Sequence, residues 1–146
     1  MPKLVSLVCS CFLLFAPLTS IAQDTGTSPK AVPPIIATGM RAYKGGGPDA
    51  AIQAWIKGGP LDGNRSALSQ ANTLHQVQDF YGAYQSFDVL AVRSLDPRTH
   101  IFYLILNLER GPLFAKFVVY RSGDDWIVTS FNFNTSDEAI LPPSLE

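Results

Sequence analysis

The fold of this chain is decided by residues 87–134, which read FDVLAVRSLDPRTHIFYLILNLERGPLFAKFVVYRSGDDWIVTSFNFN. Runs rich in β-branched and aromatic residues alternate there with short sequences of turn-forming residues. We predict four strands, at Phe87–Ser94, His100–Arg110, Leu113–Arg121 and Trp126–Asn134. Because the connections are short, consecutive strands should pair as hairpins and form an antiparallel meander.

The two central strands have faces of different character. If Arg110-Gly111 is a two-residue loop, Leu108 lies opposite Leu113 and Leu104 lies opposite Phe117. Because side chains alternate along a strand, one apolar face then holds Phe102, Leu104, Leu106, Leu108, Leu113, Ala115, Phe117 and Val119. A mixed face holds Ile101, Tyr103, Ile105, Asn107, Phe114, Lys116, Val118 and Tyr120. The apolar face predicts a covering layer of helices.

The outer strands follow from the assumed loop lengths. A three-residue first loop adds Asp88, Leu90 and Val92 to the apolar face. A four-residue loop after Arg121 adds Trp126, Val128, Ser130 and Asn132, and it sends Ile127, Thr129, Phe131 and Phe133 to the mixed face. A loop of odd length would exchange the last two sets, because a slip of one residue inverts a strand.

Helices are expected before the sheet. Pro48–Lys57 has proline at its first position and Gly58 just beyond its end, which is typical helix punctuation. A longer helix over Ser66–Tyr84, capped by Asn64 or Ser66, carries an amphipathic stripe of Ala67, Ala71, Leu74, Val77, Tyr81 and Tyr84. A short helix over Ile35–Tyr43 is separated from these by the glycine run 45–47, which we interpret as a hinge.

Residues 1–22 have the pattern of a cleavable signal peptide. Lys3 precedes an apolar run over Leu4–Ala16, and Ser20-Ile21-Ala22 forms a small-residue cleavage site. An uncleaved anchor is the alternative. We therefore expect a secreted or periplasmic protein, with a flexible linker at 23–34 and a single α+β domain at 35–146. Both cysteines lie in the signal, so the mature chain is expected to contain no disulfide.

Composition limits the function further. The chain has 146 residues, of which 47% are hydrophobic, a length and balance typical of one globular domain. The formal net charge is −1, so there is no basic stripe for nucleic-acid binding. His75 and Asp79 are spaced to share a helix face, but two ligands are too few for a structural zinc site. We expect no metal and no cofactor.

Several short motifs carry a resemblance over roughly Ile35 to the C-terminus. They are Ala50–Trp55, Phe80–Tyr84, Arg110–Phe114, Asp125–Val128, Phe131–Asn134 and Leu141-Pro142. Together with the order of helices and strands, they resemble the nuclear transport factor 2-like superfamily, and within it small exported bacterial proteins of uncharacterised type. The resemblance implies a cone-shaped α+β fold, with N-terminal helices packed on a curved four-stranded antiparallel sheet.

The resemblance also implies a pocket between the curved sheet and the long helix. The predicted faces place Tyr81, Tyr84, Asp88, Trp126, Ser130 and Asn132 at such a pocket. Our leading hypothesis is a domain that binds a small apolar ligand or acts as an accessory to a protein partner. The alternative is a small isomerase or dehydratase, with Asp88 as general base and Tyr81 or Tyr84 as hydrogen-bond donor.

The mixed face is too apolar to be left in open solvent. We expect either a homodimer through Tyr103, Lys116, Val118 and Tyr120, or a cover formed by the N-terminal segment.

Overall fold

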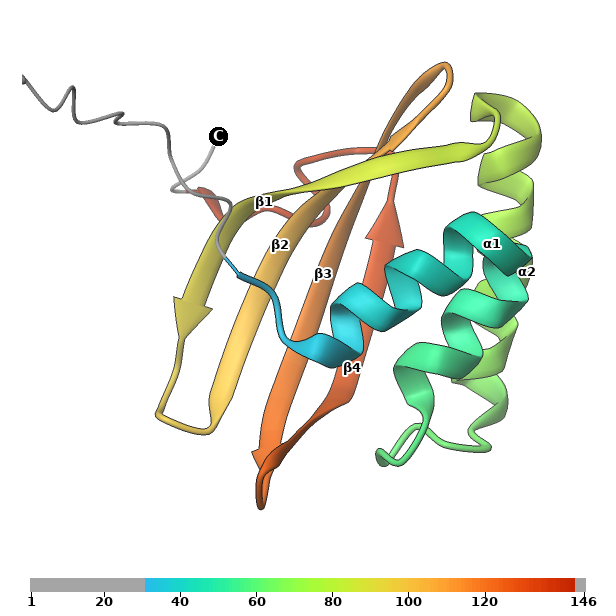
Figure 1. The fold of residues 1–146 in the computed structure, drawn as a ribbon. Coiled ribbons are helices and arrows are strands. Elements are labelled where there is room, and N and C mark those ends of the chain that lie inside the picture. Colours follow the sequence, from blue (N-terminus) through green and yellow to red (C-terminus); the bar gives the residue numbers. More distant parts are fainter. Residues whose placement is uncertain (1–30, 144–146) are drawn as a thin grey trace, which may run out of the picture.

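The computed structural model describes residues 31–143, which form two helices on one face of a four-stranded antiparallel sheet (Figure 1). The elements are α1 (Pro34–Ile56), α2 (Arg65–Tyr81), β1 (Tyr84–Ser94), β2 (Thr99–Leu108), β3 (Gly111–Ser122) and β4 (Asp125–Asn134). The strands pair in the order β1-β2-β3-β4. The predicted α+β class and the meander are confirmed, whereas the predicted signal sequence lies outside the described residues.

The predicted alternation in the two central strands is also confirmed. Phe102, Leu104, Leu106 and Leu108 of β2 are buried with Leu113, Ala115, Phe117 and Val119 of β3. All eight belong to one core cluster with the buried side chains of α1 and α2. We call this helix-covered side the inner face of the sheet, and the opposite side the outer face.

The β2–β3 hairpin differs from its predicted register by two residues. Glu109 and Arg110 form the loop, so Leu108 pairs with Gly111 and Leu104 pairs with Ala115. Both loop residues are hydrogen-bonded to the chain around the end of α2. Arg110 N donates to O of Tyr81, the last residue of α2, at 2.8 Å, and Glu109 N donates to O of Ala83, just before β1. A shift by two residues keeps every side chain on the same face of the sheet. The predicted core residues are therefore correct although the predicted register is wrong.

In β1, a bulge between Val89 and Ala91 contradicts the predicted face of Asp88. Val92 pairs with Phe102 on the inner face, as predicted. Beyond the bulge the alternation inverts, so Val89 faces inward and Asp88 pairs with Ile105 on the outer face. Leu90 is the unpaired residue and is 38% exposed. The prediction was therefore wrong for Asp88 and Leu90.

A second bulge inverts β4 between its pairings with Val118 and Val119. Val128 pairs with Val119 on the inner face, as predicted, but Ser130 pairs with Val118 on the outer face. The predicted inner positions of Ser130 and Asn132 are therefore wrong. Phe131 and Phe133, which were predicted on the mixed face, pair with Phe117 and Ala115 and pack in the main core.

Helix α1 is two arms joined by a kink. Gly47 has φ 76° and ψ −167°, which are non-helical values, and Pro48 begins the second arm. The predicted hinge thus lies within the glycine run, and Figure 1 shows the second arm turning back beside α2. Trp55 of the second arm donates its indole N–H to Ile36 O of the first at 3.2 Å, in a buried position.

Helix α2 begins and ends at recognisable caps. Asn64 accepts hydrogen bonds from Ser66 N and Ala67 N through its side chain, one of the two caps predicted. The helix ends three residues earlier than predicted because Gly82 has φ 82° and its N–H donates to Gln78 O. Tyr84 therefore belongs to β1 rather than to the helical stripe.

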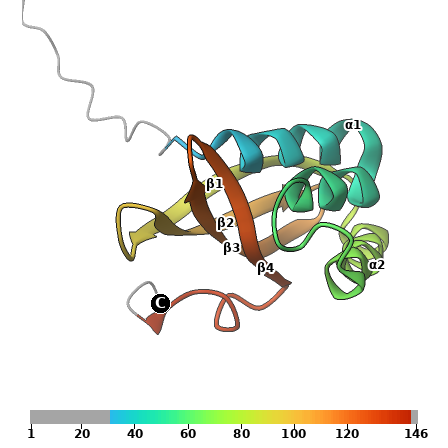
Figure 2. The same cartoon turned by 90° about the horizontal axis from the view of Figure 1, so that it is seen from below.

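The outer face is partly covered by the C-terminal segment, whereas most of the N-terminal segment predicted as its cover lies outside the described residues. Ile140 is 5% exposed and packs in a second apolar cluster with Ile101 and Tyr103. Figure 2 shows residues beyond β4 crossing the sheet on the side away from the helices. We predicted Tyr103 as an exposed residue of a dimer face. It is only 5% exposed, because the C-terminal segment covers it. Lys116, Val118 and Tyr120 remain half-buried on this face.

The close contact between the two arms of α1 gives a test of the fold. A Cβ at Gly39 would collide with the buried indole of Trp55, so Gly39→Ala should lower the free energy of unfolding by about 2 kcal/mol. Gly45→Ala is the matched control, because nothing lies near its Cβ, and it should raise stability by roughly 0.5–1 kcal/mol. Urea denaturation of both variants measures this, and equal stabilities would contradict the packing.

Candidate functional site

The predicted pocket between sheet and helix is occupied by side chains. The Trp55 ring lies 5.0 Å from the Phe117 ring, 6.4 Å from Phe131 and 5.7 Å from Phe133, measured between centroids. Trp55 and Phe117 are fully buried. Phe131 and Phe133, which we predicted on the mixed face, therefore occupy the space that a ligand would need.

Asp88 lies on the outer face and is exposed. Its carboxylate accepts a hydrogen bond from Asn107 Nδ2 at 2.8 Å, and the same nitrogen donates to Ser86 Oγ at 3.2 Å. This is a surface network across β1 and β2. Asp88 does not converge with Tyr81 and Tyr84 on one enclosed cavity, so the constellation on which the enzyme hypothesis rested is not assembled.

Tyr84 lies instead in the core, against Tyr43 of α1. The two rings stack with centroids 4.8 Å apart and an interplanar angle of 3°. Burial raises the pKa of Tyr43 from 10.0 to about 12. Burial, and next the charges of Tyr43 and Asp88, raise the pKa of Tyr84 to about 12. Tyr81 is half-buried at the end of α2, with its ring against Gly111.

The remaining predicted pocket residues separate into two groups. Ser130 and Asn132 are exposed on the outer face of β4, paired with Val118 and Lys116. Trp126 is half-buried at the start of β4 and packs edge-on against His100, with centroids 4.9 Å apart. Trp126 alone of the six predicted pocket residues lines the hollow described next.

An open groove of 800 Å³ lies between the two arms of α1 and the tip of the β3–β4 hairpin. Its lining is Pro34, Ile35, Thr38, Gln53, Ala54, Lys57, Gly58, Asp124, Asp125, Trp126 and Ile127. We call it the hairpin groove. The kink at Gly47 creates it, because it brings residues of both α1 arms to one end of the sheet. Volumes of this order are typical of small-molecule sites.

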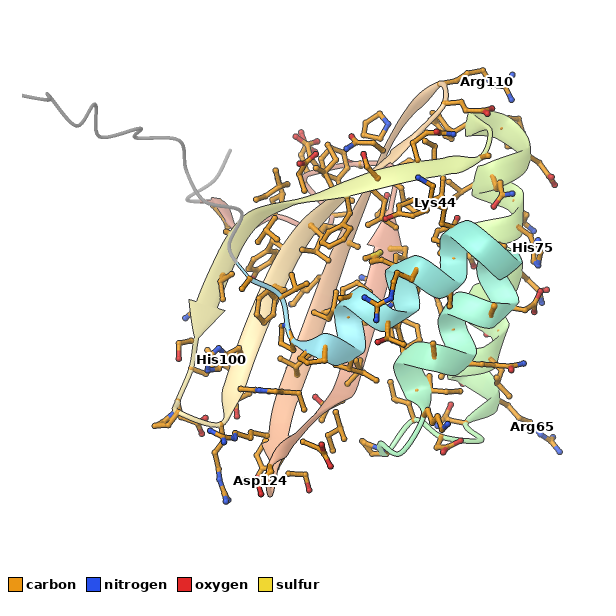
Figure 3. All side chains as sticks on the ribbon, viewed as in Figure 1. Lys44, Arg65, His75, His100, Arg110 and Asp124 are labelled. Atoms are coloured by element: carbon orange, nitrogen blue, oxygen red, sulfur yellow. The ribbon has the colours of Figure 1, made fainter. Side chains whose placement is uncertain are left out.

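The chemistry of the hairpin groove is mixed. Ile35, Ala54, Trp126 and Ile127 give it apolar surface, and Thr38 and Gln53 offer hydrogen bonds from α1. Lys57 supplies one positive charge from the end of α1, and Asp124 and Asp125 supply two negative charges from the hairpin. Figure 3 shows Asp124 at the hairpin tip and His100 at the same end of the sheet. Such a surface suits a compact molecule with an apolar body and a polar head.

Two other hollows among the described residues are smaller. One of 450 Å³ lies beside Val77, Phe80 and Tyr81 of α2, and one of 310 Å³ lies between α1 and β1 at Met40, Lys44 and Tyr84. Within residues 31–143, no three metal-ligating side chains gather at one place. None of the helices in that range combines the length and the apolar character that a membrane span requires.

No protein-family model, no curated protein and no solved structure matches this chain. The class of protein is therefore defined by the fold alone, as a two-layer α+β domain with its helices ahead of an open antiparallel sheet.

Sequence reasoning missed most of the groove residues. It identified Trp126 as a pocket residue, but it did not single out Ile35, Gln53 or Lys57, which come from both arms of a kinked helix. The available signal was the glycine run before Pro48, since a sharp kink there folds the second arm back toward the first.

The stacked tyrosines Tyr43 and Tyr84 should make the free energy of unfolding fall at alkaline pH. Because their folded-state pKa of about 12 lies above the ordinary 10.0, their contribution is complete below pH 10.0 and is lost as pH rises toward 12. We expect the free energy of unfolding to fall across this window by roughly 2 kcal/mol for each tyrosine. Denaturation from pH 9 to about 12 measures this.

Tyr43→Phe is the matched variant. Its hydroxyl is buried and has no hydrogen-bond partner among the described residues, so its removal should cost no more than about 0.5 kcal/mol at neutral pH. The variant should also lose roughly half of the alkaline dependence. An unchanged pH profile in Tyr43→Phe would show that this ring does not titrate late.

Proposed function

We propose that this protein is an exported binding domain that holds a compact organic molecule in the hairpin groove. The observation that carries the proposal is the groove itself, which joins apolar surface, hydrogen-bonding groups and charge in one hollow of 800 Å³. The signal-like residues 1–22 support export. The order of helices and strands supports a place among nuclear transport factor 2-like proteins, whose fold alone does not define a function.

Ligand binding without chemical change is better supported than catalysis by a general base. The interior of the domain is filled by aromatic side chains, so a ligand is confined to the rim of the sheet. A general base needs a pocket that perturbs its pKa and excludes water. The carboxylates of the groove, Asp124 and Asp125, are exposed at a hairpin tip instead. Such groups orient a ligand by charge rather than activate it.

The charges in the groove indicate the preferred head group. The lining contains two carboxylates and one ammonium, and Asp124 also lies 4.0 Å from the guanidinium of Arg121, which leaves Asp125 as the carboxylate without such a neighbour among the described residues. Trp126 offers an aromatic surface, which attracts cations through its ring electrons. Ile35 and Ile127 leave room for an apolar body. The proposed ligand class is therefore a small organic amine with an apolar or aromatic portion.

A pair of probes with one body and opposite charge tests this proposal. 2-Phenylethylamine should bind in the groove, whereas phenylacetate should bind more weakly. In ¹H–¹⁵N spectra the indole N–H of Trp126 should shift with the amine, and that of the buried Trp55 should not. Changing Asp124 and Asp125 together to Asn should raise the Kd for the amine about fivefold, the scale expected for exposed charges.

Two control variants make the result specific. Lys57→Gln should leave amine binding unchanged or strengthen it, because it removes a like charge. Phe80→Ala alters the hollow beside α2 and should leave the Trp126 shift unchanged. Absence of any shift at Trp126, or equal affinity for the amine and the carboxylate, would refute the proposed site.

A further inference from the structure

The chain beyond β4 forms a short segment that lies across the outer face of the sheet (Figure 2). We call residues 135–143 the C-terminal strap. Residues 135–139 are exposed, whereas Ile140 is 5% exposed and packs with Ile101 and Tyr103. Leu141 is half-buried against the same cluster, as are Ala91, Phe114 and Val118 of the sheet. Two adjacent apolar side chains thus cover the centre of β2 and β3.

The strap is fastened to the sheet by these side chains rather than by backbone pairing. Ile140 N and Leu141 N both donate to Asp137 O, at 2.8 and 2.7 Å, within the strap itself. Ser136 N donates to Asn134 Oδ1 at 2.9 Å, at the end of β4. Within residues 31–143, the strap's hydrogen bonds are therefore local. Lifting it breaks no ladder bond of the sheet and costs only the burial of its apolar side chains.

The surface beneath the strap is continuous with further apolar side chains. Ile105, Phe114, Val118 and Tyr120 lie on the outer face and are half-buried with the strap in place. With the strap lifted, Ile101 and Tyr103 join them into one patch over β2 and β3. An apolar patch of this extent on a sheet face requires another cover.

The charges at the edges of this patch suit a second copy of the same chain. Asp88 lies on the outer face of β1, and Lys116 lies on the outer face of β3, on the other side of β2. Consider two copies packed outer face to outer face, with a two-fold axis parallel to β2 between the two sheets. This symmetry places β1 of one copy opposite β3 of the other. Each Asp88 then lies near the Lys116 of the other copy, twice in one dimer. An isologous contact requires this self-complementarity.

We propose that the C-terminal strap is a displaceable cap over a homodimer surface. With the strap in place the protein is a monomer, and with the strap lifted two copies pack outer face to outer face. The hairpin groove lies among the helices and the β3–β4 tip, so this proposal does not depend on ligand binding.

The strap variant Ile140→Asp with Leu141→Asp tests the proposal. Wild type should have monomer mass in light scattering across a concentration series, and the variant should approach dimer mass as concentration rises. Ala139→Asp is the matched control, because Ala139 is exposed in the same segment, and it should remain a monomer. Adding Val118→Asp to the strap variant should restore the monomer, whereas adding Asn72→Asp, an exposed position on α2 away from the outer face, should not.

Three results would overturn the proposal. They are a strap variant that is folded by circular dichroism yet monomeric throughout, a wild-type protein that is already a dimer, and association that Val118→Asp leaves unchanged. Hydrogen exchange of the wild type gives a test that does not depend on the variant folding. The amides of Ile140 and Leu141 should exchange at least about tenfold faster than those of Leu104 and Phe117. Exchange of both groups at one common rate would show that the strap does not open separately.

Discussion

The structure depends on the burial of one side chain, the indole of Trp55. It lies between the two arms of α1 and the inner face of the sheet, fully buried, and it donates its N–H to Ile36 O. Gly39 supplies the space beside it, since a Cβ there would overlap the ring. Phe117, Phe131 and Phe133 form its other side. A buried indole needs both an apolar surface and a partner for its N–H, and both are supplied here.

This packing determines where function can be located. Within residues 31–143, the rings of Trp55, Phe117, Phe131 and Phe133 occupy the space between the helices and the inner face. The kink at Gly47 places Thr38 and Gln53, from different arms of α1, at the same end of the sheet, where the hairpin groove opens. The outer face is partly covered by the C-terminal strap. The same fold thus offers an open groove at its rim and a covered sheet surface on its opposite side.

The central part of the fold was predictable because alternation in two long apolar strands leaves little choice. Leu104 and Phe117 were assigned to the correct face even though the hairpin register was wrong by two residues. The outer strands were less predictable, because a bulge adds one residue without a signature in the sequence. The bulge in β1 moved Asp88 outward, and that in β4 moved Ser130 outward and Phe131 inward.

The strap and the groove were missed for a related reason, since both depend on contacts between distant parts of the chain. Ile140 and Leu141 form an apolar pair after five exposed residues, a pattern that indicates an anchor but does not identify what it contacts. The groove needs Lys57 and Trp126 at one place, and only the kinked path of α1 brings them together. Local patterns therefore specified the elements and most of the core, whereas the candidate site depended on the backbone irregularities.

The most direct test of this account is the solvent accessibility of Trp55. The chain contains two tryptophans, so in Trp126→Phe the emission comes from Trp55 alone. The account predicts blue-shifted emission that acrylamide scarcely quenches in the folded protein and quenches strongly after denaturation. Emission like that of free indole, with strong quenching in the folded protein, would contradict the central packing and the kinked arrangement of α1 that depends on it.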